Sequence, residues 1–184
     1  MKDLTVYIGR FSPFHRGHAE VLKRALLTSK KVLVLIGSSD QPRTIKNPFT
    51  ADERESMIRG YVETSTPSFA DRLVVKHLVD IPYNDQRWLQ QVQSKIESER
   101  VNEDDVITIT GANRDDSSYY LNLFPNYKLD LVAEDMSVSQ FLSATTVREI
   151  YFGRFFNDKP LTANEVDILI HSFLPPSTLK FLKV

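Results

Sequence analysis

The run of five apolar residues from Val32 to Ile36 most constrains how this chain can fold. A strand with one solvated face alternates apolar and polar residues, so a continuous run predicts a strand covered on both faces. Similar short runs recur along the chain, and the predicted strands are Leu4–Ile8, Val32–Ile36, Leu73–Val79, Val106–Thr110 and Leu129–Val132. Segments with helical spacing lie between them, and the predicted helices are Gly17–Ser29, Thr50–Tyr61, Trp88–Glu99, Ser117–Phe124, Thr145–Phe152 and Asn164–Phe173.

Strands that alternate with helices predict an α/β fold of the Rossmann-like, doubly wound kind, a mostly parallel sheet with helices on both faces. Thr50 is the expected N-cap of its helix, and Glu53 stands where it completes a capping box. Doubly wound sheets bind ligands beyond the carboxyl ends of their strands. The segments that directly follow the predicted strands are therefore the first candidates for a functional site.

Composition excludes several classes of protein. The 184 residues suffice for one sizeable core, and a net charge of −1 offers no long basic surface for nucleic acid. The absence of cysteine excludes disulfides and thiolate metal sites. No apolar segment of the sequence is long enough to span a bilayer. We therefore expect a cytoplasmic protein without nucleic-acid or membrane partners.

The segment after the first predicted strand reads GRFSPFHRGH, residues 9–18. Gly9 lets the backbone approach a phosphate closely, and the first amides of the following helix favour an anion. His15 and His18 lie about one helical turn apart, so their imidazoles can donate hydrogen bonds to phosphate oxygens. Taken alone, a His-x-x-His pair also fits surface residues or a weak metal site.

A second candidate segment lies late in the chain, where residues 142–148 read LSATTVR. Ser143 and Thr145 can cap a helix N-terminus, and their hydroxyl groups suit an anion. Arg148 offers a planar pair of donors for phosphate oxygens. The alternative for this segment alone is an ordinary capped helix with a surface arginine.

Together the two segments resemble the GxFxPxHxGH and ISxTxxR motifs of the nucleotidyltransferase superfamily of cytidylyl- and adenylyltransferases, with Leu142 in place of the isoleucine. The resemblance implies that His15, His18 and Arg148 take part in catalysis. It implies that ATP contacts Gly9, Arg10, Phe11, His15, His18, Ser143, Thr145 and Arg148. It also implies that Mg²⁺ acts through the ATP phosphates, without a metal site built from protein residues.

The segment IPYNDQRW, residues 81–88, bears on the second substrate. Trp88 is the only tryptophan and can stack on a positively charged pyridinium ring, while Asn84 and Asp85 can contact an amide or a ribose. The alternative is that Trp88 anchors its helix in the core. The segment resembles the nicotinamide-binding loop of archaeal-type nicotinamide-nucleotide adenylyltransferases, which implies that nicotinamide mononucleotide binds here.

Two further segments extend the resemblance. Residues 47–54, NPFTADER, are similar to the family's PFTxxER segment, which implies that Arg54 contacts nicotinamide mononucleotide; the alternative is a surface salt bridge with Asp52 or Glu55. Residues 111–121 are similar to a GxxxDxSxYYL stretch of bifunctional nicotinamide-nucleotide adenylyltransferase/Nudix hydrolases. This second likeness implies ATP contacts at Gly111, Asn113 and Asp115, whereas Ser117, Tyr119 and Tyr120 fit capping and packing.

The resemblance implies a nucleotidyltransferase domain over residues 1–172 and a linker-like tail over residues 173–184. No Nudix signature is present in the sequence, so hydrolase activity is not expected of this chain. The expected reaction joins nicotinamide mononucleotide to the AMP part of ATP by in-line attack on the α-phosphate, giving NAD and pyrophosphate. Two alternatives stay open: another adenylyl- or cytidylyltransferase, for example with a pantetheine-phosphate acceptor, and a non-catalytic nucleotide sensor. A homo-oligomer is an expectation by analogy alone.

Overall fold

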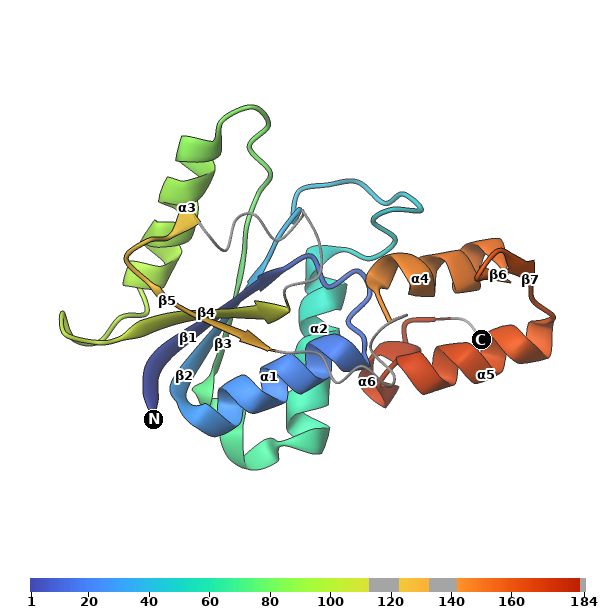
Figure 1. Ribbon diagram of the computed structural model, residues 1–184, viewed down its shortest axis with the longest axis horizontal. Helices are drawn as coiled ribbons and strands as arrows, with labels where there is room; N and C mark the ends of the chain where they lie inside the picture. The colour runs from blue at the N-terminus through green and yellow to red at the C-terminus, as the bar shows by residue number, and fades with distance from the viewer. Residues whose placement is uncertain (113–122, 133–141, 183–184) are drawn as a thin grey trace.

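The computed structural model describes residues 1–112, 123–132 and 142–182 of the chain (Figure 1). Its main sheet is parallel throughout and has the strand order β3-β2-β1-β4-β5. The strands of this sheet are β1 (Lys2–Gly9), β2 (Ser29–Ile36), β3 (Leu73–His77), β4 (Ile107–Ala112) and β5 (Lys128–Val132). The α-helices are α1 (Arg16–Thr28), α2 (Ala51–Ser65), α3 (Asp85–Glu97), α4 (Ala144–Arg148), α5 (Ala163–Phe173) and α6 (Pro176–Leu179). A 3₁₀ helix (Pro67–Arg72), a π-helix (Glu149–Gly153) and a hairpin of β6 (Phe155–Phe156) and β7 (Lys159–Pro160) complete the described elements.

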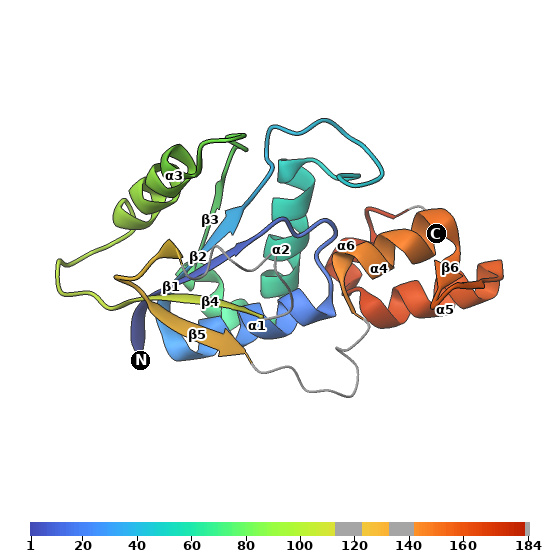
Figure 2. The ribbon, with the colours of Figure 1, turned by 45° about the horizontal axis from the view of Figure 1, so that its top comes forward.

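Helices cover both faces of the sheet, as the apolar run of β2 predicts. Val32, Val34 and Ile36 belong to a core that they share with apolar residues of α1 and α2. Leu33 and Leu35, which point to the opposite face, belong to a second core with residues of α3. Figures 1 and 2 show α3 on one side of the sheet and α1 with α2 on the other. The predicted doubly wound, Rossmann-like fold is confirmed.

The topology determines where a ligand can bind. From β1 the chain proceeds through β2 to β3 on one side, whereas β4 and β5 lie on the other side of β1. The strand order therefore reverses between β1 and β4, where Tyr7 pairs with Thr110. Crevices beyond the carboxyl ends of strands at such a reversal are the usual ligand sites of open α/β sheets. The loop after β1, residues 10–15, lies at this position.

Several predicted element boundaries are wrong: α2 runs to Ser65 rather than Tyr61 and β2 begins at Ser29 rather than Val32, and three further differences have a local reason. Strand β3 ends at His77 rather than Val79, because the Val79 amide donates to Gln91 Oε1 of α3 (3.0 Å) instead of continuing the sheet. Helix α3 begins at Asp85, three residues before Trp88, because Asn84 caps it. The predicted helix Thr145–Phe152 is divided into α4 and the π-helix. Most of the predicted helix Ser117–Phe124 lies outside the described residues.

The C-terminal segment packs onto the domain beside the loop after β1 (Figure 2). Phe173, Leu174 and Leu182 are buried in the core that α1 and α2 share. Thr178 is fully buried, and its hydroxyl donates to the carbonyl oxygen of Phe14 at 2.8 Å. The sequence interpretation treats residues 173–184 as a linker-like tail, whereas residues 173–182 are part of this packed structure.

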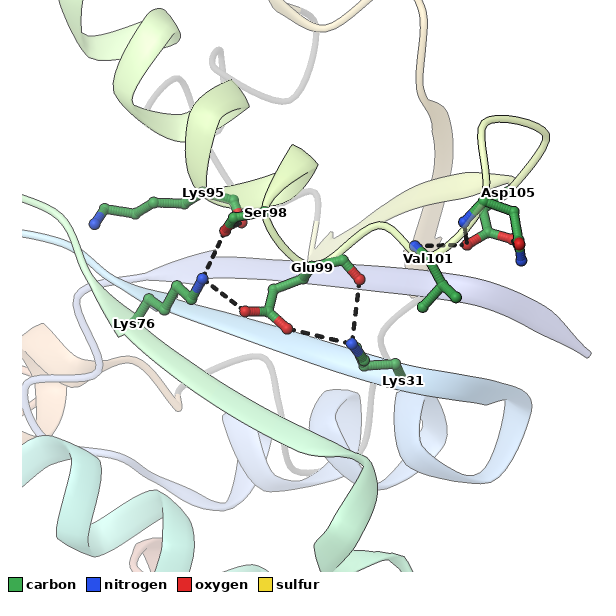
Figure 3. Close-up of polar contacts among 8 residues, drawn as sticks. Lys31, Lys76, Lys95, Ser98, Glu99, Val101 and Asp105 are labelled. Atoms are coloured by element: carbon green, nitrogen blue, oxygen red, sulfur yellow. Dashed lines mark hydrogen bonds and ion pairs between the residues drawn. The ribbon is translucent and has the colours of Figure 1, made fainter.

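A polar cluster joins the end of α3 to two neighbouring strands (Figure 3). The Glu99 carboxylate forms ion pairs with Lys31 of β2 at 3.2 Å and with Lys76 of β3 at 2.6 Å. Lys76 also donates to the hydroxyl of Ser98 at 2.6 Å. The hydrogen bond from Lys76, followed by that from Lys31, lowers the pKa of Glu99 below its ordinary value of 4.5. The cluster holds the segment after α3 against the sheet.

Glu99→Gln is expected to lower the free energy of unfolding at pH 7 by about 1 kcal/mol, which lowers Tm by roughly 2–4 °C. Because the folded-state pKa of Glu99 is depressed, its stabilisation is present above pH 4.5 and is lost as the pH falls through the folded-state pKa. Denaturant unfolding at pH 7 and at about pH 3 measures this difference. Glu103→Gln, at an exposed position, is the control. An equal loss for Glu99→Gln at both pH values would contradict the ion-pair account.

Candidate functional site

The loops after β1, β2 and β3 and the start of α4 meet at the carboxyl end of the sheet. The amide of Gly37, after β2, donates to the carbonyl of Gly9 at 2.9 Å. The hydroxyl of Ser38 donates to the carboxylate of Asp80, after β3, at 3.1 Å. Arg148 of α4 donates to the carbonyl of Ser12, after β1, at 2.7 Å. These bonds place residues of both predicted phosphate-binding segments at one location.

His15 and His18 cap α1 reciprocally. The amide of His18 donates to His15 Nδ1 at 3.4 Å, and the amide of His15 donates to His18 Nδ1 at 3.3 Å. The two rings are stacked, with centroids 3.6 Å apart. Because each Nδ1 accepts a hydrogen bond, the proton of each neutral imidazole resides on Nε2. This capping box therefore selects the tautomer that donates through Nε2.

Phe11 explains why glycine stands at position 9. A Cβ atom at Gly9 would lie 2.9 Å from the ring of Phe11, closer than such contacts normally occur. The Phe11 ring is 1% exposed and packs edge-on against Tyr7 and His18. Its side chain is a core residue that supports the histidine, so only the Phe11 backbone can face a ligand.

Arg148 connects α4 to the loop after β1. Its guanidinium donates to Ser12 O at 2.7 Å and to Thr145 Oγ1 at 3.0 Å. Ser143 caps α4 by accepting from the Thr146 amide at 3.0 Å, as predicted. Burial, followed by the charge of Arg10, lowers the pKa of Arg148. Arg10 and Arg148 therefore lie close enough for their charges to repel, and a bound anion would relieve this repulsion.

Arg54 lies beneath the same loops, on α2. Thr50 and Glu53 form the predicted capping box at the start of this helix. Arg54 is only 2% exposed, and its guanidinium donates to backbone carbonyls of the loops after β1 and β2. The alternative interpretation, a surface salt bridge between Arg54 and Asp52 or Glu55, is wrong, because the Arg54 side chain points inward and binds backbone carbonyls. Burial, and next the charge of Arg10, lowers the pKa of Arg54.

The predicted acceptor residues lie at the start of α3. Asn84 Oδ1 accepts from the Arg87 amide at 3.0 Å as the N-cap, and Asp85 is in the first turn. Trp88 is half-buried beside the second core, with its ring centroid 6.4 Å from that of Phe124. The core-anchor alternative for Trp88 therefore has structural support. Asn84 and Asp85 are exposed.

The sequence predicts ATP contacts at Gly111, Asn113 and Asp115. Of these three residues, the structure describes Gly111. It lies in β4 one residue beyond Thr110, at the ligand-binding end of the sheet. Asn113 and Asp115 lie outside the described residues.

Sequence reasoning missed the polar connection between the loops after β2 and β3. Besides the Ser38–Asp80 bond, the Asp80 amide donates to Asp40 Oδ1 at 3.1 Å, and the Ser39 amide donates to Leu78 O at 3.0 Å. The available signal was the group of short polar residues directly after the VLVLI strand. Such residues often hydrogen-bond nearby backbone in loops.

The side chains of the site suit an anion better than a cation. Among the described residues, no group of three or more His, Asp or Glu side chains could hold a metal ion. A mostly apolar hollow of about 460 Å³ lies next to Arg148, with one further cation, Lys46, and one carboxylate, Glu149; it is lined by Ile45, Lys46, Thr145, Arg148, Glu149, Phe152 and Gly153. His15, His18 and Arg148 are thus the side chains of this site that could donate to an anion.

Comparison with known proteins shows that the chain is similar to nucleotidyltransferases. A cytidylyltransferase-like family model matches residues 6–150. The chain is 34% identical over 182 residues to a nicotinamide/nicotinic acid mononucleotide adenylyltransferase of Acinetobacter baylyi, covering 98% of this chain and 85% of that protein.

Solved structures of a bifunctional NMN adenylyltransferase/ADP ribose pyrophosphatase from Francisella tularensis have the same fold. One shares 30% identity at a TM-score of 0.73 and covers 93% of this chain but 49% of that chain. Another, complexed with AMP and a manganese ion, shares 26% identity at a TM-score of 0.72. The match covers 98% of this chain and 52% of that chain. The chain thus spans about half the length of the Francisella protein.

Inorganic pyrophosphate at about ten times its Kd is expected to raise the Tm of the protein by a few degrees, because an anion that binds only the folded state stabilises it. Arg148→Ala should reduce this increase to less than about one degree. Thermal denaturation with and without pyrophosphate measures both. Arg24→Ala, which removes an arginine of α1 that pairs with Asp130 and lines a separate hollow with Met1 and Lys2, should retain the increase. An undiminished increase in Arg148→Ala would show that the anion binds elsewhere.

Proposed function

Because the chain belongs to the cytidylyltransferase-like family, we propose that it transfers the AMP part of ATP to nicotinamide mononucleotide, forming NAD and releasing pyrophosphate. One observation carries this proposal: the loop after β1 holds the reciprocal His15–His18 cap and is bound by Arg148, so these three side chains belong to one region at the reversal of the sheet. The similarity over nearly the whole chain to the Acinetobacter enzyme supports the choice of substrates.

In the proposed reaction, a 5′-phosphate oxygen of nicotinamide mononucleotide attacks the α-phosphorus of ATP in line, and the bond to the β-phosphate breaks. The attacking oxygen is already an anion near neutral pH, so the step needs no general base. Catalysis then consists of positioning and charge stabilisation. The Nε2–H groups of His15 and His18 donate to phosphate oxygens, and Arg148 stabilises the negative charge that develops on pyrophosphate.

The remaining roles are assigned by position. We propose that ATP is bound by the backbone of Gly9 and Phe11, by Arg10, by the β4 end at Gly111, and by the hydroxyl groups of Ser143 and Thr145. Asn113 and Asp115 keep their proposed role in binding ATP from the family resemblance. For the acceptor, Trp88 is the proposed stacking partner of the nicotinamide ring. Asn84 and Asp85, at the exposed start of α3, are its proposed polar contacts.

Among the described residues, the side chains of this site do not offer a divalent ion a binding site of their own. The side chains that surround the proposed phosphate position are histidine and arginine, which do not coordinate Mg²⁺ well, and the described residues offer no carboxylate cluster. We therefore propose that Mg²⁺ enters on the triphosphate oxygens, where it would neutralise part of their charge. The related Francisella structure with AMP and a manganese ion is consistent with this use of a divalent ion.

The proposed folded unit extends from residue 1 to at least Leu182, because residues 173–182 pack on the core. No helix in the described ranges has the length and apolar character that crossing a membrane requires. A cytoplasmic location and assembly into a homo-oligomer remain proposals by analogy with the family.

An acceptor panel tests the proposed function. Pyrophosphate release is measured with ATP or CTP, and with nicotinamide mononucleotide, nicotinic acid mononucleotide or pantetheine phosphate as acceptor. The proposal predicts release with ATP and nicotinamide mononucleotide and formation of NAD. Release only with pantetheine phosphate or CTP would favour another transferase of the family. Nucleotide binding without release under any combination would favour a non-catalytic sensor.

His18→Ala is expected to lower kcat by about one hundred-fold or more, because it removes a donor to the reacting phosphates. Since His18 also caps α1, His18→Asn is the matched variant, whose amide oxygen can replace Nδ1 as the acceptor. Both variants should lose activity, with the Tm of His18→Asn closer to that of the wild type. A loss of less than about threefold in either variant would remove His18 from the mechanism.

Trp88→Ala is expected to raise the KM for nicotinamide mononucleotide by about tenfold and the KM for ATP by much less, because only the acceptor would lose a stacking partner. Steady-state kinetics with each substrate varied in turn measure the two constants. Trp88→Phe retains an aromatic face and should stay within about threefold of the wild type. An equal rise in both KM values would indicate that Trp88 acts only through packing beside Phe124.

A further inference from the structure

We propose that Arg54 is a positioning residue: it orients the backbone of the loops after β1 and β2 so that their amides, rather than their carbonyls, face the phosphate groups of the substrates. The inference rests on the proposed function for the identity of those phosphates. It replaces the direct substrate contact that the sequence motif implied for Arg54.

All three guanidinium nitrogens of Arg54 are occupied by backbone carbonyls. Nε donates to Thr50 O at 3.2 Å, within its own helix. Nη1 donates to Arg10 O at 2.6 Å and to Gly37 O at 2.7 Å, and Nη2 donates to Ser38 O at 3.0 Å. A substrate contact would have to break several of these bonds and expose a side chain that is 2% exposed.

The carbonyls that Arg54 binds precede two residues with unusual backbone conformation. Phe11, which follows Arg10, has a φ of 52°, and Ser38, which follows Gly37, has a φ of 50°. Residues with a side chain rarely adopt this left-handed region, which is unfavourable unless the surroundings stabilise it. Arg54 supplies this stabilisation at both positions, because it binds the carbonyl of the peptide that enters each residue.

The direction of the amides follows from peptide geometry. A trans peptide is planar, and its N–H points opposite to its C=O. With the carbonyls of Arg10 and Gly37 directed at Arg54, the amides of Phe11 and Ser38 point away from it. Neither amide has a hydrogen-bond partner within the described part of the chain. These amides are therefore available as donors.

Two backbone amides that point away from Arg54 make the electrostatic potential more positive where an anion would bind. Backbone amides that line a concave site can bind an anion, and the loops of Phe11 and Ser38 lie side by side because the Gly37 amide donates to Gly9 O at 2.9 Å. If the same peptides were reversed, their carbonyl oxygens would face the phosphates and repel them. Arg54 thus acts on the substrates through the backbone of Phe11 and Ser38, while the charge of Arg10 acts directly.

Arg54→Lys tests this role, because lysine keeps the charge but lacks the planar guanidinium that reaches both loops. Arg59→Lys, in the same helix and paired with Glu55 at the surface, is the matched control. The readouts are kcat/KM for each substrate and the ¹⁵N–¹H amide signals of the ligand-free protein. Arg54→Lys should lower kcat/KM for ATP and for nicotinamide mononucleotide by similar factors of about tenfold or more, and shift the amides of Phe11 and Ser38. Arg59→Lys should leave kcat/KM within about twofold and those two amides unshifted.

Two results would overturn the proposal. A fall in kcat/KM for nicotinamide mononucleotide alone would show a direct contact with the acceptor. Lost activity with unshifted Phe11 and Ser38 amides would show that Arg54 acts by another route.

Titration of the folded wild-type protein with pyrophosphate provides a test that does not depend on whether the variant folds. The amide signals of Phe11 and Ser38 should move as the anion binds, and constant signals at saturation would contradict the proposal. This titration needs no acceptor, so its result does not depend on the proposed reaction. Failure of the proposed reaction would appear instead as the absence of pyrophosphate release by the wild-type protein.

Discussion

The bonds of Arg54 and Arg148 to backbone carbonyls are the interactions on which the candidate site depends. Arg148 binds the carbonyl of Ser12, and Arg54 binds those of Arg10, Gly37 and Ser38. Carbonyl oxygens carry only partial charge, so these bonds hold each guanidinium without cancelling its positive charge. A carboxylate partner would have neutralised it. The loops are therefore held in place by two arginines whose charge is opposed only at longer range, by Asp80 for Arg54 and by Glu149 for Arg148.

This arrangement requires both ends of the chain. The loop after β1 contains the histidines, but Arg148 and Thr178, which bind the carbonyls of Ser12 and Phe14, come from the last quarter of the sequence. The parallel sheet brings them together, since α1 starts directly after β1 and the C-terminal helices pack beside this start (Figure 1). The fold thus places the leaving-group side of the proposed reaction, at α4, against the histidine pair.

Local patterns in the sequence predicted much of this structure, whereas contacts between distant segments could not be predicted. The VLVLI run, the Thr50–Glu53 capping box and the Ser143 cap depend on neighbouring residues, so their physical signals are present in short windows. The resemblance selected His15 and His18 as site residues, which stays a prediction, and their reciprocal cap is evident only from the structure. For Arg54 the motif marked the residue but not its contacts with the loops, because its partners there lie 16 to 44 positions away. The sequence predicts the start of α3 three residues too late, because the bond from the Arg87 amide to Asn84 Oδ1 that begins the helix is evident only from the structure.

The central claim is that the site directs attack at the α-phosphorus of ATP. The most direct measurement follows the fate of label from ATP labelled separately at the α- and γ-phosphates, with nicotinamide mononucleotide as acceptor. The account predicts that the α-label appears in NAD and the γ-label in pyrophosphate, in equal amounts. Release of the γ-label as inorganic phosphate, or recovery of the α-label in ADP or free AMP instead of NAD, would contradict it.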